Sequence, residues 1–280
     1  MIRPRRSVLF TPGSGARALD KAKTLPADAL ILDLEDAVAP DTKDRARDAV
    51  VAAVRSGFGK REVVVRINAL GSAWGEPDVL AMAAAHPDAV LIPKVQNPND
   101  VLKVSDRLPK TIAVWAMIET PAGVLDVKEI AAAGDRLSCL VIGSNDLIKE
   151  MGGTHTPDRT NIAAALTFTV LAARRYGLGV IDGVHNDIAD SAGFAAVCAQ
   201  GRAFGFDGKT LIHPSQIGPC NAAFAPRAEE VVAARRIIAA FDLPENADKG
   251  AILFDGCMVE RLHTNSARRL VALAEAIAAR

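Results

Sequence analysis

The sequence predicts a (β/α)8 barrel, in which eight parallel strands alternate with helices around a closed sheet. Short apolar runs alternate with longer amphipathic stretches along most of the chain. The apolar runs are nearly continuous, which is typical of parallel strands that are buried on both faces. The length of 280 residues suits one barrel of this kind with a short extension.

Each strand and helix of this barrel is expected at a definite place in the chain. The expected strands are Ser7–Thr11, Ala29–Leu34, Val63–Ile67, Ala89–Pro93, Ile112–Ile118, Cys139–Gly143, Gly179–Asp182 and Lys209–Ile212. The expected helices are Ala16–Thr24, Thr42–Arg55, Pro77–Ala85, Asn99–Leu108, Pro121–Ala133, Thr160–Tyr176, Ile188–Phe204 and Ala228–Ala240. Several begin with a helix-start signal, such as Thr120 followed by Pro121. Eight such units favour a closed barrel over an open, doubly wound sheet.

The chain continues beyond the eighth unit into a segment of a different kind. Residues 244–250 are polar, 251–254 are apolar, Asp255 and Gly256 form a turn signal, and 265–279 have the pattern of an amphipathic helix. We therefore predict a catalytic barrel domain of residues 1–242 and a C-terminal extension of residues 243–280. The extension can pack on its own barrel or on a neighbouring subunit, and the sequence pattern leaves both arrangements open.

Composition excludes several classes of protein. Half of the residues are hydrophobic, and 33 Lys and Arg balance 33 Asp and Glu, so disorder and broad attraction to nucleic acid or membrane are not expected. The four cysteines form no Cys-x-x-Cys pair, which favours free thiols over a disulfide framework or a zinc knuckle. The apolar run near the N-terminus is too short for a signal peptide. A cytoplasmic location is expected.

Two carboxylates at neighbouring strand ends are the sharpest candidates for chemistry. Glu119 follows the fifth expected strand and Asp146 follows the sixth. Adjacent strands of one barrel lie about 4.8 Å apart, so both side chains can reach one point above the rim. Two carboxylates with open positions suit Mg²⁺. The alternative is that Glu119 caps the helix at Pro121 while Asp146 accepts hydrogen bonds from backbone amides.

Other polar residues at strand ends are candidates for the same site. The acidic run of Asp33, Glu35 and Asp36 can orient metal-bound water, although it can also be a solvated loop. Arg66 ends the third strand and suits a substrate carboxylate or a developing enolate oxygen. The alternative is a structural salt bridge between Arg66 and the acidic run.

Two further segments carry weaker signals for ligand binding. Gly143, Ser144 and Asn145 can present main-chain amides to a substrate carboxylate, although an ordinary turn has the same sequence pattern. Arg17 and Lys21 share a face of the first helix, behind a loop of small residues that offers amides to an anion. A plain solvated helix face explains these two residues equally well.

Several motifs lie at residues 7–13, 31–38, 65–68, 93–95, 116–121, 182–184 and 208–217. Together, over nearly the whole chain, they resemble one known family, the citrate lyase beta-subunit-like branch of the HpcH/HpaI aldolases. The resemblance implies a (β/α)8 barrel and a Mg²⁺-dependent carbon–carbon lyase. The implied substrate is a 3-hydroxyacyl thioester, such as citramalyl-CoA, malyl-CoA or a citryl thioester, which gives an acetyl thioester and a 2-oxo acid. Either coenzyme A or an acyl-carrier protein can carry the acyl group.

The resemblance also implies roles for particular residues. Glu119 and Asp146 look like the metal ligands, Arg66 like the arginine that stabilises the enolate oxygen, and Arg17 and Lys21 like contacts to the coenzyme A phosphates. In the family the C-terminal tail delivers an acidic residue into the next subunit of a trimer, so a homotrimer or hexamer is expected. Glu260 stands here where several relatives carry Asp, and the extra methylene shifts the carboxylate.

The activity itself has a first interpretation and two rivals. In the lyase interpretation Glu260 moves the proton, Arg66 stabilises the enolate, and Lys94 is a structural or ion-paired residue rather than a Schiff base. The first rival is a malyl-CoA thioesterase on the same scaffold. The second is a non-catalytic binding or regulatory subunit, against which the retained Glu119, Asp146 and Arg66 argue.

Overall fold

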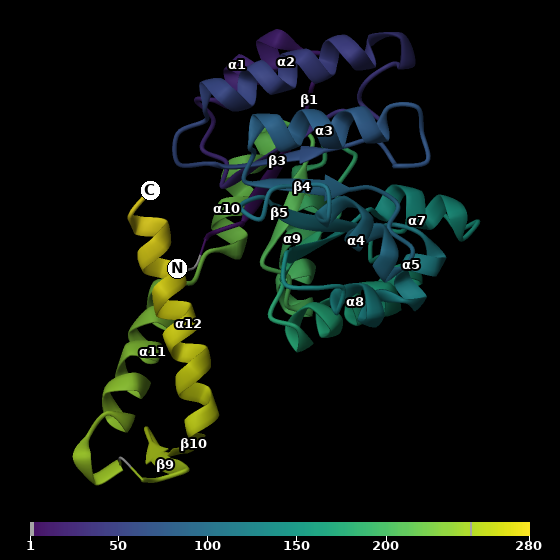
Figure 1. The fold of residues 1–280 in the computed structure, drawn as a ribbon. Helices are drawn as coiled ribbons and strands as arrows, with labels where there is room; N and C mark the ends of the chain where they lie inside the picture. Colours follow the sequence, from purple (N-terminus) through teal and green to yellow (C-terminus); the bar gives the residue numbers. More distant parts are fainter. Residues whose placement is uncertain (1–2, 247) are drawn as a thin grey trace. The chain divides into compact units, whose positions relative to one another are not determined.

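The computed structural model describes residues 3–246 and 248–280, which form two compact units. One unit is Arg5–Phe224, and the other contains residues 225–280 together with residues 3 and 4. Figure 1 draws the chain from purple at the N-terminus to yellow at the C-terminus. No helix among the described residues is both long and apolar enough to cross a membrane.

The first unit is a closed barrel of eight parallel strands in sequence order, with β8 pairing back to β1. The predicted fold class is confirmed. The strands are β1 (Ser7–Pro12), β2 (Ala29–Asp33), β3 (Glu62–Arg66), β4 (Ala89–Ile92), β5 (Ala113–Ile118), β6 (Leu137–Ile142), β7 (Gly179–Asp182) and β8 (Gly208–Leu211). All eight coincide with the expected runs to within a few residues, because the strands are largely buried on both faces of the sheet.

Helices follow the strands and cover the outside of the barrel (Figure 1). The α-helices are α1 (Ala16–Ala22), α2 (Lys43–Ser56), α3 (Gly75–Ala85), α4 (Pro98–Ser105), α5 (Pro121–Leu125), α6 (Val127–Ala131), α7 (Ser144–Glu150), α8 (Ala163–Arg175), α9 (Ser191–Phe204) and α10 (Ile217–Phe224). Short 3-10 helices are η1 (Pro40–Thr42), η2 (Thr160–Ile162) and η3 (Pro214–Gln216). The sequence patterns did not predict α7, which begins directly after β6, nor the division of residues 121–133 into α5 and α6.

The barrel has apolar cores on both sides of its sheet, which explains the unbroken apolar runs. Ala29 and Ile31 of β2 belong to a small cluster inside the barrel, around Trp115. Leu30 and Leu32 of the same strand point outward into a larger cluster beneath the helices. Successive side chains on a strand alternate between its two faces, so one short strand contributes to both cores.

The same alternation brings polar side chains to the C-terminal end of the barrel interior. Continuing inward along β2 from Ala29 and Ile31 leads to Asp33, and on β3 Arg66 follows the inward-facing Val64. The register pairs Asp33 directly with Arg66. The inward apolar layers therefore end in a charged layer at the mouth of the barrel.

The second unit is built from two helices and a hairpin. Its elements are α11 (Ala228–Phe241), η4 (Pro244–Asn246), β9 (Ala251–Phe254), β10 (Cys257–Glu260) and α12 (Arg261–Ala278). Strands β9 and β10 pair antiparallel, and Asp255 and Gly256 both have the positive φ that a tight turn requires. The apolar run, turn and helix that the sequence predicted here are all present.

The expected boundary lay between residues 242 and 243, but in the structure the second unit already begins at residue 225. The expected eighth barrel helix, 228–240, corresponds to α11, which packs against α12 in the second unit. The short helix α10 takes its place in the barrel, where it packs against β8 and β1. The α10 segment is only eight residues long, so periodicity alone did not reveal that it covers the barrel. Whether the extension packs on a neighbouring subunit stays a prediction.

Candidate active site

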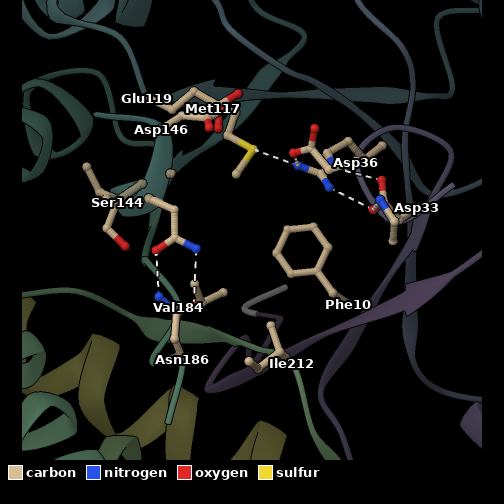
Figure 2. A pocket seen from close by; sticks show the side chains of 15 residues that line it. Phe10, Asp33, Asp36, Met117, Glu119, Ser144, Asp146, Val184, Asn186 and Ile212 are labelled. Atoms are coloured by element: carbon tan, nitrogen blue, oxygen red, sulfur yellow. Dashed lines mark hydrogen bonds and ion pairs between the residues drawn. The ribbon is translucent and has the colours of Figure 1, made fainter. Parts of the chain in front are cut away.

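A cavity of about 320 Å³ lies at the C-terminal ends of the barrel strands. In this fold the loops at that end carry the reacting groups. Figure 2 shows the cavity, with Asp33 and Asp36 on one side, Glu119 and Asp146 on another, and Asn186 on a third. The lining residues are Phe10, Asp33, Asp36, Ala37, Arg66, Met117, Glu119, Ile142, Gly143, Ser144, Asn145, Asp146, Val184, Asn186 and Ile212.

Arg66 forms the centre of a buried charge network at this mouth. Its Nε and Nη2 donate to the two carboxylate oxygens of Asp33, both at 2.7 Å. Its Nη1 lies 3.0 Å from Glu35 Oε2 and 3.2 Å from Asp36 Oδ2. The alternative of a salt bridge between Arg66 and the acidic run is therefore confirmed. Arg66 also lines the cavity, so its structural pairing does not remove it from the candidate site.

The environment of Arg66 keeps it charged and fixed in position. Burial alone lowers the pKa of the guanidinium, but the hydrogen bonds and charge of Asp33 outweigh burial, so its pKa is raised above the ordinary value. The guanidinium also packs 4.9 Å from the centre of the Phe10 ring. Phe10 is a lining residue that the sequence analysis missed, although its place on the first strand next to a strand end was a usable signal.

Asp33 also shapes the loop that carries the other acidic residues. Its carboxylate accepts hydrogen bonds from the backbone N–H of Glu35 and of Ala37. Glu35 is thereby held at the mouth with only 9% of its surface exposed, whereas the side chain of Asp36 is 60% exposed. The acidic run is an ordered part of the site rather than a solvated loop.

Glu119 lies almost completely buried beside the cavity, with 2% of its surface exposed. Its Oε1 accepts a hydrogen bond of 2.8 Å from the backbone N–H of Lys94. Burial, together with the negative charge of Glu35, raises the pKa of Glu119 from its ordinary 4.5 to about 7. The helix at Pro121 is capped by Thr120, whose hydroxyl accepts from Gly123 N–H. The alternative role of Glu119 as a helix cap is therefore wrong.

Gly143 makes room for Glu119 at the start of the next loop. A Cβ at this position would lie 2.5 Å from the Cβ of Glu119 and still closer to its carboxylate. Only glycine is compatible with this approach. Ser144 and Asn145 follow in the first turn of α7 and line the cavity. Asn145 exchanges two amide hydrogen bonds with Asn186, at 2.8 and 3.1 Å, and Asn186 is a further lining residue that we did not predict.

Asp146 reaches the same cavity from the first turn of α7, and Lys94 connects it to the other carboxylates. Lys94 Nζ lies 2.7 Å from Glu35 Oε1 and 3.2 Å from Asp146 Oδ2. This confirms the interpretation of Lys94 as an ion-paired residue. Burial lowers the pKa of Lys94, but the hydrogen bond to Glu35 and the charges of Glu35 and Glu119 outweigh burial and raise it.

The carboxylates therefore form an oxygen-rich site that suits a hard cation. Among the described residues, no three or more His, Cys, Asp or Glu side chains gather as a metal cluster. Glu119 and Asp146 are nevertheless brought to one cavity, as predicted. Mg²⁺ is commonly held by one or two carboxylates and completes its shell with water or substrate oxygens. The donor set thus fits Mg²⁺ better than Zn²⁺, which prefers thiolate and imidazole ligands.

Three predicted site residues are not among the residues that line this cavity. Arg17 and Lys21 are exposed on α1, and neither is among the described residues that line it. Glu260 belongs to the second unit, where it ends β10 and its backbone N–H donates to His263 Nδ1. The roles of Arg17, Lys21 and Glu260 stay predictions.

The fold and the site together define a class of protein: a (β/α)8 barrel with paired carboxylates and a buried guanidinium at its C-terminal mouth. Residues 6–214 match the family model described as HpcH/HpaI aldolase/citrate lyase. The chain therefore belongs to the HpcH/HpaI aldolase/citrate lyase family, as the sequence motifs predicted.

Alignments with characterised relatives extend over almost the entire chain. It is 48% identical over 277 residues to a (3S)-malyl-CoA thioesterase of Cereibacter sphaeroides, which covers 99% of this chain and 96% of the relative. It is 35% identical over 284 residues to the citrate lyase subunit beta of Escherichia coli, covering 98% and 94% of the two chains. Family members thus include both lyases and a thioesterase.

A solved structure shares the fold over the same length. The protein CitE of Mycobacterium tuberculosis, in complex with magnesium, acetoacetate and coenzyme A, has a TM-score of 0.80 and 33% identity. The match covers 98% of this chain and 100% of the CitE chain. Relatives of this chain are therefore known to bind magnesium and coenzyme A.

Proposed function

We propose that this protein is a Mg²⁺-dependent enzyme that acts on a 3-hydroxyacyl-CoA thioester of a dicarboxylic acid, with (3S)-malyl-CoA as the first candidate substrate. The observation that carries the proposal is the gathering of Glu119, Asp146 and Arg66 at one cavity. Two carboxylates there can hold a divalent ion, and a guanidinium beside them can bind a carbonyl or carboxylate oxygen.

The balance of charges supports a cation in this position. Glu35, Glu119 and Asp146 all contact Lys94, whose single ammonium pairs with two of them. Arg66 is already committed to Asp33 through two short hydrogen bonds. Glu119 has a raised pKa because burial and a neighbouring acid disfavour its charged form. A divalent ion would relieve this excess of negative charge.

The residues of the chain would divide the work of binding and activation. Glu119 and Asp146 would hold Mg²⁺, which supplies Lewis-acid polarisation of substrate oxygens when it is bound. Arg66 would stabilise negative charge that develops on the thioester oxygen. Asn145 and Ser144 offer polar groups to the acid end of the substrate. Phe10, Met117 and Ile212 add apolar surface to the lining of the cavity, which would limit the entry of water.

We place thioester hydrolysis first among the possible reactions, because 48% identity over nearly the whole chain links it to a malyl-CoA thioesterase. In hydrolysis the oxygen of water bonds to the thioester carbon, the carbon–sulfur bond breaks, and the sulfur leaves as the thiol of coenzyme A with a proton from the water. The other product is the free dicarboxylic acid.

Carbon–carbon cleavage is the second candidate, supported by 35% identity to a citrate lyase subunit. In this reaction the 3-hydroxyl loses its proton, the bond between C2 and C3 breaks, and the thioester enolate takes a proton to give acetyl-CoA and a 2-oxo acid. Arg66 has the same task in both reactions, because both create negative charge on the thioester oxygen. Carbon–carbon cleavage also needs a group that transfers the proton, and Glu260 remains the candidate for that role.

A product assay distinguishes the two reactions. The full-length protein is incubated with malyl-CoA, with and without Mg²⁺, and the products are separated by chromatography. We expect malate and free coenzyme A in equal amounts, and activity that a chelator abolishes. Glyoxylate with acetyl-CoA would favour the lyase instead. No turnover of malyl-CoA, citramalyl-CoA or their acyl-carrier-protein thioesters would contradict both candidates.

The raised pKa of Glu119 leads to a prediction for pH. Its folded pKa of about 7 lies above the ordinary 4.5, so between these values the folded protein retains a proton that the unfolded chain has lost. The free energy of unfolding of the metal-free protein should therefore fall as pH rises through this window. Mg²⁺ binds the carboxylate form, so the rise in Tm caused by Mg²⁺ should be larger at about pH 8 than at about pH 6.

Differential scanning fluorimetry at both pH values, with and without Mg²⁺, measures this effect. The variant E119Q serves as the reference, because it has no carboxyl group to titrate at this position. A Mg²⁺-induced rise in Tm that is independent of pH in the wild type would contradict the assignment of Glu119 as the titrating ligand.

A further inference from the structure

Lys94 occupies an unusual position in the candidate site. It follows β4 and has a backbone φ of 51°, a left-handed conformation that residues other than glycine rarely adopt. This conformation directs its backbone N–H to Glu119 while its side chain reaches Glu35 and Asp146. One residue thus contacts both candidate metal ligands and a neighbouring acid, through two different groups.

The two contacts of Lys94 have different consequences for the carboxylates. The backbone N–H holds Glu119 in place whatever side chain stands at position 94. The ammonium instead supplies positive charge, at 2.7 Å from Glu35 and 3.2 Å from Asp146. Arg66 also pairs with Glu35, at 3.0 Å, but its ion pairs are with Asp33, Glu35 and Asp36 and do not extend to Asp146. The ammonium therefore balances like charges that would otherwise repel one another.

We propose that Lys94 is a tethered counter-ion of the metal site: its ammonium holds Glu35 and Asp146 together before a divalent ion binds, and must give up Asp146 when the ion arrives. The inference rests on the metal site of the proposed function. The side chain of Lys94 is 37% exposed, so it has a path toward solvent. Lys94 is a positioning residue in this account and makes no contact with reacting atoms.

This role has a consequence for the affinity of the site. The Lys94 ammonium already neutralises Asp146, so it competes with Mg²⁺ for this carboxylate. After it has left Asp146, the ammonium still repels the nearby ion electrostatically. Removing the ammonium should therefore tighten the binding of a divalent ion. If Lys94 only supported the fold, its removal would weaken that binding instead. The two roles predict changes of opposite sign.

Titration of divalent ions into chelator-treated protein tests the inference without reference to turnover. The variants K94M and K94R of the full chain are compared with the wild type by Mn²⁺ electron paramagnetic resonance and by calorimetry with Mg²⁺. K94M keeps the length of the side chain and the backbone N–H to Glu119. We expect K94M to bind either ion at least about tenfold more tightly, from the loss of one charge within a few ångströms of the ion. K94R should stay within about threefold of the wild type, because it keeps that charge.

Thermal stability supplies a second readout and a control. Metal-free K94M should have a lower Tm than the wild type, and Mg²⁺ should raise its Tm by more than it raises that of the wild type. Lys128 lies on α6 with a side chain that is 74% exposed, outside the cavity, so K128M should match the wild type in affinity and in Tm.

The outcomes separate the inference from the function on which it rests. If the wild type binds neither Mn²⁺ nor Mg²⁺, the metal site of the proposed function fails. If the wild type binds and folded K94M binds equally or more weakly, the function stands and the counter-ion role is wrong. If K94M folds only when Mg²⁺ is added, the role is supported, because the ion then replaces the missing ammonium. If K94M fails to fold under any condition, K94Q provides the same comparison with a polar neutral side chain.

Discussion

Glu119→Gln is expected to abolish metal-dependent turnover while leaving the fold intact. Glutamine has the same shape as glutamate, so it can still accept the hydrogen bond from Lys94 N–H and fit against Gly143. It lacks the negative charge that a divalent ion requires. Loss of a Lewis acid that contributes several kcal/mol to a reaction should lower kcat/KM by about a thousandfold or more.

The stability of E119Q separates a chemical effect from damage to the fold. Because the pKa of Glu119 is raised to about 7, its charged form is disfavoured in the folded protein without metal. Metal-free E119Q should therefore be at least as stable as the wild type above that pH. Steady-state kinetics and calorimetric Mg²⁺ titration measure the loss. E129Q changes an exposed glutamate on α6 and should behave as the wild type. Full activity in E119Q would disprove the metal assignment.

Replacing Arg66 should produce the second large effect, on stability and activity together. In R66M the buried carboxylate of Asp33, which is 1% exposed, loses both of its guanidinium hydrogen bonds. Removing one partner of a buried ion pair typically costs about 3–5 kcal/mol. R66K keeps the charge but cannot donate to both oxygens in the same planar geometry, so a smaller loss of stability is expected.

A double variant distinguishes the structural task of Arg66 from its catalytic one. In D33N/R66M the uncompensated charge at residue 33 is removed, so the free energy of unfolding should recover in part relative to R66M. Turnover should not recover, because no guanidinium remains to stabilise the thioester oxygen. Urea denaturation and kcat/KM report the two effects separately. R107M, which removes an exposed partner of Glu76, is the control. Recovery of turnover in the double variant would show that Arg66 acts only through the fold.

Several features of the site were predictable because they depend on local sequence. Glu119 follows the apolar run of β5, and Arg66 ends the run of β3, so the strand ends identified both as residues of the barrel mouth. Lys94 was correctly interpreted as ion-paired, since a lysine at a strand end beside acidic residues has partners within reach. The family motifs added specificity, because they join residues that are distant in the sequence.

Other features depend on contacts that no local pattern contains. The register of β2 against β3 pairs Asp33 with Arg66, and this pairing decided that Arg66 is a structural as well as a candidate catalytic residue. The left-handed backbone of Lys94 decided that its N–H reaches Glu119. Asn186 lines the site and forms an amide hydrogen-bond pair with Asn145, which belongs to a different segment of the chain. Each of these depends on how separate strands and loops approach one another.

The barrel, the positions of its strands and the carboxylates at its mouth could all be predicted from the amino-acid sequence. The physical reason is that burial on two faces leaves a continuous apolar run, and the end of that run marks where side chains reach the mouth. The folded structure was needed to show which charges pair, which helix covers the eighth strand, and at which residue the second unit begins. Charge pairing and helix packing are set by distances between segments, and these arise only when the sheet closes.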